Sequence, residues 1–241
     1  MSDEAKTLQC IIDKSENIVF FGGAGVSTES GLKDFRSVDG LYSLKYDYPP
    51  EEILSHNFFF SHTAEFFRFY YDKLLVNGIK PNAAHYKVAE LERAGKLKAV
   101  VTQNIDGLHQ AAGSKVVYEL HGSVKRNRCF KCNAFYDDTY IAARNGDIPY
   151  CACGGIVKPE VVLYGEGLDD ATVNGAISAI IKADTLIVAG TSLSVYPASA
   201  LIDYFRGKYL VLINKGEVMR DIRADLYIDG KVGETLKKIK V

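Results

Sequence analysis

Four cysteines lie close together in the chain, with a spacing that suits a metal ion. Cys129 and Cys132 form a CxxC pair, and Cys151 and Cys153 follow as a CxC pair before two glycines. Four thiolates suit tetrahedral zinc, and a closed four-sulfur shell leaves no position for a substrate, so the expected ion is structural. A redox pair or buried free thiols are the alternatives, but clustering of four cysteines favours zinc.

A second group of reactive side chains follows two apolar runs. His121 comes directly after the run 116–120, while Gln103, Asn104 and Asp106 come after the run 97–101. A lone histidine is more often structural than catalytic. The neighbouring amide and carboxylate groups, which suit ribose hydroxyls and a carboxamide, make a catalytic role for His121 more plausible. We interpret the other histidines as structural (His85 and His109) or without signal (His56 and His62).

The stretch 17–36 reads NIVFFGGAGVSTESGLKDFR and predicts a buried strand that enters a glycine-rich turn. Glycines allow a backbone to approach an anion, and a helix beginning after them would offer free N–H groups to a pyrophosphate. The dinucleotide pattern GxGxxG fits Gly23 and Gly25 but has Thr28 at its third glycine position. By itself the turn is equally consistent with a tight connection that binds nothing.

Composition limits the classes of function. The chain has 241 residues, enough for one large domain or for one domain with a small insertion, and a formal net charge of −1. That charge gives no electrostatic case for binding bulk nucleic acid or a membrane surface. No apolar run approaches the roughly 20 residues of a membrane span, and the first ten residues lack the pattern of a signal peptide. We therefore expect a cytoplasmic protein in which cysteines are not paired in disulfides.

The elements that must position these groups alternate between helices and strands. Helical spacing covers 5–15, an aromatic helical region covers 51–76, and Pro81-Asn82 opens a helix that Gly95 ends. Short, nearly continuous apolar runs occupy 18–21, 97–101, 116–120, 185–189 and 209–213, as expected of parallel strands covered on both faces. The fold class expected is α/β, with a doubly wound, Rossmann-like parallel sheet whose polar strand ends form the site.

Taken together in order, the motifs resemble the sirtuin family of NAD-dependent protein lysine deacylases. They are GAGVSTESG with DFR, TQNID, HG, the two cysteine pairs, CGGIVKPEVVLYGE, GTSLSVYPA and a late IN, and they span about 17–236. The resemblance implies that His121 is the general base, with Asn104 as the other catalytic residue. It also implies a set of NAD contacts: Ala24, Gly25, Thr28, Asp34, Phe35, Arg36, Gln103, Ile105, Asp106, His121, Gly190, Thr191, Ser192, Asn214, Lys215 and Val232.

The same resemblance implies a peptide site and a reaction. Val161, Val162, Leu163, Tyr164 and Gly165 match the segment that pairs with the substrate backbone as an added strand. The acyl-lysine carbonyl oxygen would attack the nicotinamide ribose as nicotinamide leaves. His121 would then activate a ribose hydroxyl, so that the acyl group ends on ADP-ribose and the lysine is freed.

The chain differs from the usual family sequence at two places, and a third place separates family members by their acyl preference. Leu32-Lys33 replaces the family's usual Ile-Pro, which removes a stiffening proline, and Tyr164 replaces a frequent phenylalanine. Members that prefer acidic acyl groups carry Tyr and Arg at the positions that align with Phe67 and Tyr70 of this chain. Without the arginine a buried carboxylate would be unpaired, so acetyl or longer apolar acyl groups are expected instead of succinyl.

The expected organisation has an NAD-binding domain (1–36, 96–123 and 159–241), a cofactor loop with a helical module (37–95), and a zinc module (124–158). Acyl-lysine in proteins is the expected partner, with no specific nucleic acid and no membrane; the sequence does not give the oligomeric state, and a monomer is plausible. Protein mono-ADP-ribosyl transfer is the alternative activity. A dehydrogenase is disfavoured because the acidic residue expected after a second strand is replaced by a tyrosine-rich loop. A zinc-ribbon interaction module would leave the NAD-like residues unexplained.

Overall fold

The computed structural model describes residues 2–33, 46–75, 78–216, 218 and 222–241, and the statements below concern these residues. Its larger unit is a parallel sheet of six strands in the order β3-β2-β1-β7-β8-β9. The strands are β1 (Ile18–Gly22), β2 (Leu97–Thr102), β3 (Val117–Glu119), β7 (Thr185–Ala189), β8 (Tyr209–Asn214) and β9 (Leu226–Asp229). The order reverses direction between β1 and β7, which in sheets of this kind opens a ligand crevice at the carboxyl ends of the strands.

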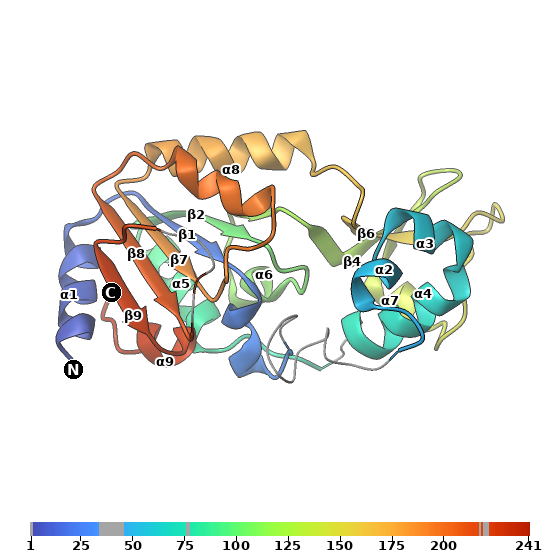
Figure 1. Cartoon of the computed structure of the whole chain (residues 1–241), viewed down its shortest axis with the longest axis horizontal. Helices are drawn as coiled ribbons and strands as arrows, with labels where there is room; N and C mark the ends of the chain where they lie inside the picture. Colours follow the sequence, from blue (N-terminus) through green and yellow to red (C-terminus); the bar gives the residue numbers. More distant parts are fainter. Residues whose placement is uncertain (1, 34–45, 76–77, 217, 219–221) are drawn as a thin grey trace.

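Both faces of this sheet are covered, which explains why its strands read as continuous apolar runs. In β1, Ile18 and Phe20 belong to one hydrophobic cluster, whereas Val19 and Phe21 belong to another on the opposite face. On the first face lie α1 (Asp3–Lys14), α5 (Ala83–Arg93) and α9 (Val232–Leu236); on the second lie α8 (Asp170–Lys182) and η5 (Ala198–Tyr204). Figure 1 shows α8 lying across the top of the sheet. The doubly wound fold expected from the sequence is therefore confirmed.

Local signals set the boundaries of α5 as expected. The Asn82 side chain accepts from Ala84 N–H, while His85 Nδ1 accepts from the Asn82 N–H, so the two residues form a capping box. Gly95 follows the helix with a φ of +74°, a left-handed conformation that favours glycine. His85 and His109 are both fully enclosed and pack ring against ring, which fits the structural role expected for them.

The smaller unit, on the right in Figure 1, combines helices and a three-stranded sheet around one hydrophobic core. Its strands are β4 (Gly122–Cys129), β5 (Phe135–Asp137) and β6 (Val157–Val161); its helices are α2 (Pro50–Ile53), α3 (His56–Ser61), α4 (Thr63–Phe69), the π-helical turn η4 (Tyr70–Leu74) and α7 (Asp138–Ala142). The expected helical region 51–76 is therefore broken into short pieces. Ser55 caps α3 through Phe58 N–H, and His62 separates α3 from α4.

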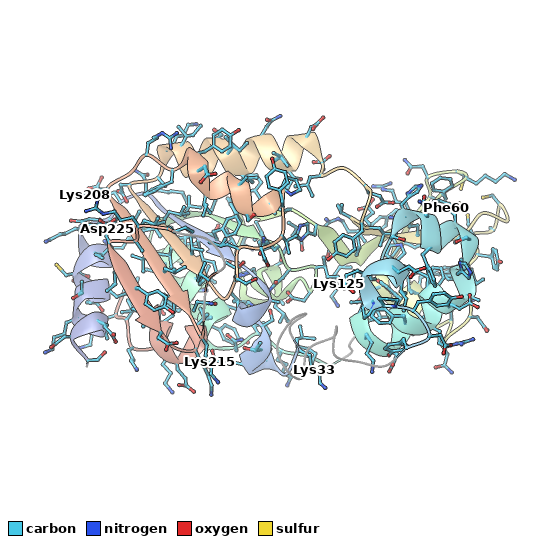
Figure 2. The ribbon with its side chains drawn as sticks, in the orientation of Figure 1. Lys33, Phe60, Lys125, Lys208, Lys215 and Asp225 are labelled. Atoms are coloured by element: carbon cyan, nitrogen blue, oxygen red, sulfur yellow. The ribbon has the colours of Figure 1, made fainter. Side chains whose placement is uncertain are left out.

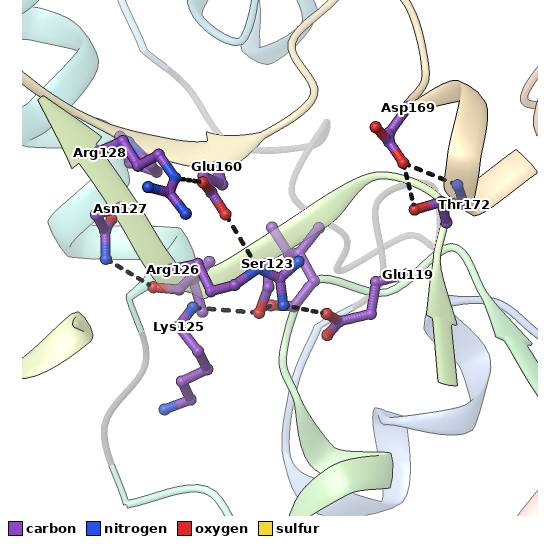
Figure 3. A network of polar contacts seen from close by, with 12 residues as sticks. Glu119, Ser123, Lys125, Arg126, Asn127, Arg128, Glu160, Asp169 and Thr172 are labelled. Carbon is purple, nitrogen blue, oxygen red and sulfur yellow. Dashed lines mark hydrogen bonds and ion pairs between the residues drawn. The ribbon is translucent and has the colours of Figure 1, made fainter. Parts of the chain in front are cut away.

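Strands β4 and β6 join the two units, and an ion-pair network connects them to the end of β3 (Figure 3). Arg126 on β4 contacts Glu119, at the end of β3, at 2.6 Å and Glu160 on β6 at 3.0 Å. Arg128 also binds Glu160. Glu119 lies two residues before His121, so this network links the main sheet to the smaller unit beside the candidate base.

Two features differ from the sequence expectations. After β1 the described chain continues as two short 3₁₀ helices, η1 (Ala24–Val26) and η2 (Thr28–Ser30), so the glycine turn leads into 3₁₀ helices instead of a regular α-helix. The sequence analysis also did not anticipate α8, β9 or the pairing of β4 with β6. Among the described residues, no helix combines the length and the apolar character that crossing a membrane requires.

Candidate active site

The glycine turn packs directly against the end of β7. Gly23 N–H donates to Ala189 O at 3.1 Å, and Gly25 N–H donates to Gly190 O at 2.8 Å. A Cβ atom at Gly25 would lie 2.8 Å from Gly190 Cα, and one at Gly23 would lie 2.7 Å from Thr191 Cβ. Contact with the neighbouring strand end therefore already requires both glycines, before any ligand is considered.

Gln103 connects three strand ends at this edge of the sheet. Its N–H donates to Gly22 O at 2.9 Å, and its Oε1 accepts from Thr191 Oγ1 at 3.0 Å. Its Nε2 is buried and has no hydrogen-bond acceptor within the described part of the chain. Because an unpaired buried amide is costly, this group is a prepared donor for a ligand hydroxyl or carbonyl.

A shared serine joins two of the expected site residues. Ser27, which is buried, accepts from Asn104 Nδ2 at 3.0 Å and donates to Asp106 Oδ2 at 2.6 Å. The other oxygen of Asp106 accepts from Leu108 N–H at 2.9 Å. The glycine turn therefore positions both polar side chains of the loop after β2, and these bonds restrict their orientations.

The candidate base, His121, has a defined tautomer. Its Nδ1 lies 2.9 Å from Gln103 O, and a carbonyl oxygen only accepts, so Nδ1 carries the proton and Nε2 carries the lone pair. Burial lowers the pKa of His121, although the bond to the Gln103 carbonyl opposes that shift. At neutral pH the imidazole is therefore uncharged, and Nε2 can accept a proton.

The segment 161–165 is attached to His121 on one side and to the helices of the smaller unit on the other. Val162 N–H donates to His121 O at 3.0 Å, and Gly122 pairs with Val161 so closely that a Cβ at Gly122 would collide with Glu160 O. Tyr164 N–H donates to Leu54 O at 2.9 Å, and Tyr164 O accepts from the N–H of residue 56 at 2.9 Å. The base and the expected peptide segment thus share one backbone framework.

The remaining expected NAD contacts lie at several places. Ala24 and Thr28 belong to the 3₁₀ turns, and Ser192 Oγ lies 2.7 Å from Ser194 Oγ beyond β7. Asn214 ends β8 and donates to Gly216 O at 3.2 Å, and the exposed Lys215 follows it (Figure 2).

The other expected NAD contacts are either engaged within the protein or lie outside the described residues. The side chain of Val232, at the start of α9, packs in the main core. Ile105 offers its carbonyl to Val124 N–H at 3.0 Å. The expected contacts Asp34, Phe35 and Arg36, and most of the tyrosine-rich loop 37–50, lie outside the described residues.

The four cysteines come together where the turn between β4 and β5 meets the segment that precedes β6. The four Sγ atoms all lie within 4.8 Å of one another, with Cys129–Cys153 and Cys132–Cys151 each at 3.5 Å. Four sulfurs around a tetrahedral zinc at about 2.3 Å would have similar mutual distances. Tyr136 Oη donates to Cys151 Sγ at 3.1 Å. The cluster therefore fits the structural zinc site expected from the sequence.

Sequence reasoning did not single out three residues that the structure places at the site. Ser27 lies within the motif GAGVSTESG, between Gly25 and Gly31, so the motif could have indicated that it belongs to the site. His56 and Glu166 bind each other across 110 positions of sequence, at 3.0 Å between Nδ1 and Oε1. No local pattern could have paired them.

Comparison with known proteins agrees with this geometry. A sequence profile described as the Sir2 family matches residues 23–197. The NAD-dependent protein deacetylases of Clostridium perfringens and Clostridium acetobutylicum are 58% and 56% identical to the chain, covering 99% and 98% of each partner. The chain therefore belongs to the Sir2 family, the sirtuins.

Solved Sir2 structures share the fold. One, from work on the mechanism and regulation of Sir2 enzymes, superposes with a TM-score of 0.89 at 43% identity, covering 99% of this chain and 96% of the other. A Sir2–p53 peptide–NAD⁺ complex gives 0.85 at 37% identity, covering 97% and 95%. A Sir2 complex with a deacetylated p53 peptide and 3′-O-acetyl-ADP-ribose gives 0.89 at 37% identity, covering 97% and 96%.

Proposed function

We propose that this protein is an NAD-dependent protein lysine deacetylase that moves the acyl group from lysine to ADP-ribose and releases nicotinamide. One observation supports this most directly: His121 has its lone pair on Nε2, and its backbone is bonded to the segment expected to hold the peptide. The Sir2 relatives with this fold are NAD-dependent protein deacetylases. The site therefore combines a neutral base with the backbone segment proposed to hold the substrate peptide.

In this proposal the polar strand ends hold NAD, which supplies a ribose carbon that becomes reactive when nicotinamide departs. Gln103 Nε2 would donate to the cofactor, since it has no acceptor among the described groups. Asn104 and Asp106, fixed by Ser27, would orient the ribose and the nicotinamide end. His121 Nε2 would take a proton from a ribose hydroxyl, which makes that oxygen the acceptor of the acyl group.

On the substrate side, the segment 161–165 would add the peptide backbone as a neighbouring strand. Val162 and Tyr164 bond to His121 and Leu54, so the segment has a fixed position relative to the base. A substrate strand placed beside it would bring one acyl-lysine into a defined register with His121. This assigns the peptide role to Val161, Val162, Leu163, Tyr164 and Gly165.

We further infer a preference for acetyl or longer apolar acyl groups. Phe67 and Tyr70 are both fully buried in the aromatic core of the smaller unit, and the intervening Arg68 is exposed. At these two positions an acidic acyl group would meet aromatic side chains and not the arginine that could pair with it. Assays with matched acetyl-lysine and succinyl-lysine peptides test the preference, and comparable kcat/KM values on both would contradict it.

The proposal also assigns roles to segments of the chain and a cellular location to the protein. Residues 1–36, 96–123 and 159–241 would bind NAD and 124–158 would hold zinc. The expected module 37–95 is divided in the structure, because α5 packs on the large sheet whereas α2, α3, α4 and η4 belong to the smaller unit. We infer a cytoplasmic location because four thiols that serve as metal ligands must stay reduced, and reducing compartments favour this.

Nicotinamide release tests the proposed activity. The protein should release nicotinamide from NAD when an acetyl-lysine peptide is present, and the same peptide with unmodified lysine should give only background. Protein mono-ADP-ribosyl transfer is the rival activity that uses much of the same pocket. Release that is equally fast with the unmodified peptide, with ADP-ribose attached to protein, would support that rival.

A further inference from the structure

The carboxylate of Glu166 gathers three different parts of the molecule at the end of the expected peptide segment. Its Oε1 lies 3.0 Å from Nδ1 of His56, on α3. Its Oε2 accepts from Lys158 Nζ, on β6, at 3.1 Å and from the backbone N–H of Leu163 at 2.9 Å. One side chain thus connects a helix, a strand and the segment itself.

The surroundings of this carboxylate make its bonds stronger than those of an exposed pair. The side chains of Glu166 and Lys158 are only 21% and 15% exposed, whereas that of His56 is 45% exposed. Burial raises the pKa of Glu166, but the Leu163 N–H, His56 and Lys158 together outweigh burial and lower its pKa below the ordinary value. The group is therefore charged at neutral pH and holds partly desolvated donors.

The same contacts define the shape of the segment. Glu166 N–H donates to Leu163 O at 2.9 Å while the Glu166 side chain accepts from Leu163 N–H, so residues 163–166 form a closed turn. Gly165 within that turn has a φ of +88°. Lys158 Nζ also donates to Val161 O at 3.1 Å, so the lysine that binds Glu166 also contacts the first residue of the segment.

We infer that Glu166 is a positioning residue that fixes the segment 161–165 in the conformation that receives the substrate backbone. This inference rests on the proposed function, because it takes the segment to be the peptide site. Among the described residues, the Glu166 carboxylate bonds to His56, Lys158 and Leu163, none of which lies at the strand ends assigned to NAD. Its loss should therefore weaken peptide binding and leave NAD binding unchanged.

Glu166→Gln tests this positioning role with little change in shape. The amide oxygen can still accept from Leu163 N–H, but the charge that holds Lys158 and His56 is lost. We expect KM for an acetyl-lysine peptide to rise roughly tenfold, as loss of about one charged hydrogen bond would give. Both kcat and KM for NAD should stay within about threefold of wild type, the range in which a substitution distant from the reacting groups is close to neutral.

Glu160→Gln is the matched control. Glu160 is a carboxylate on β6, and its side chain is bound by Arg126 and Arg128 instead of by the turn 163–166. Its substitution should leave KM for the peptide nearly unchanged. An equal rise of the peptide KM in both variants would mean that the loss of a negative charge, and not the loss of the turn, weakens peptide binding. That result would overturn the inference.

Two other outcomes are decisive. An unchanged peptide KM in Glu166→Gln, or an equal rise of KM for peptide and NAD, would contradict a positioning role. If Glu166→Gln does not fold, His56→Ala removes one half-exposed partner of the carboxylate, and a rise of about threefold in peptide KM alone is expected. Absence of acyl-dependent turnover in the wild-type protein would instead contradict the proposed function.

Discussion

The cysteine cluster and the edge of the large sheet are built in opposite ways. All four thiols come from 129–153, close to a single hairpin, whereas the sheet-edge site uses the ends of β1, β2, β3, β7 and β8. A local site can be recognised from spacing, because the chain between its ligands is short. A distributed site depends on the fold, because residues about 80 positions apart, such as Ser27 and Asp106, must meet.

The difference predicts how each region responds to damage. At the sheet edge, the proposed base His121 would have a chemical role that no neighbouring side chain can replace, so its removal should affect activity but not folding. In the cluster, the four ligands act together on the core of the smaller unit, since Cys129 and Cys151 are part of that core. Loss of the metal should therefore affect folding first.

The largest expected effect comes from His121→Ala. Deacetylation should fall by about 10²–10⁴-fold, since a positioned general base contributes about that much. The thermal unfolding temperature and NAD affinity, measured by calorimetry, should stay close to wild type because, within the described part of the chain, the His121 side chain has a single hydrogen bond, to Gln103 O. A folded variant with near-normal turnover would exclude His121 as the base.

Removal of the metal should have the next largest effect. A strong chelator should lower the free energy of unfolding by several kcal/mol, because a structural zinc contributes folding energy directly. Cys10→Ser is the matched control, since Cys10 is an exposed cysteine on α1, away from the cluster. Metal analysis with thermal unfolding provides the measurement; an unchanged unfolding temperature after metal loss would show that the smaller unit folds without its ion.

The pH profile should show the effect of burial on the pKa of His121. Burial lowers its pKa, only partly opposed by the Gln103 carbonyl, so the acid limb of kcat/KM should have its midpoint below 6.5. Because the neutral form is the base, activity should be full above that pKa and should fall about tenfold per pH unit below it. A midpoint above 6.5 would mean that the imidazole is stabilised in its charged form.

The smallest effect expected is that of Ser27→Ala. The hydroxyl holds both Asn104 and Asp106, so kcat/KM should fall roughly tenfold as those side chains gain freedom. Ser61→Ala is the control, because the Ser61 hydroxyl bonds to Asn57 O and lies beside His62 Nδ1 on the surface of the smaller unit, away from the sheet edge. Equal loss of activity in both variants would contradict a specific role of Ser27 in positioning Asn104 and Asp106.

The sequence predicted the parts of this molecule that depend on local chemistry. Continuous apolar runs indicated the strands 18–21, 97–101, 185–189 and 209–213, because a strand covered on both faces has no polar side. The capping box at Asn82 and the left-handed Gly95 set the limits of α5 as expected. The cysteine spacing predicted the cluster.

What the sequence did not predict depends on contacts between distant segments. Gly23 and Gly25 indicated a phosphate turn, but their close contact with Gly190 and Thr191 appears only when β1 and β7 pair. The fusion of helices and hairpin into one core likewise depends on the aromatic packing of Phe59 and Phe66 against β4 and β6. The His56–Glu166 contact spans 110 positions and has no sequence signature.

Mass spectrometry of the products formed from NAD and an acetyl-lysine peptide tests the central claim most directly. Nicotinamide, deacetylated peptide and O-acetyl-ADP-ribose should appear in equal amounts, and His121→Ala should suppress the last two. ADP-ribose attached to protein, with the acetyl group still on lysine, would contradict the account.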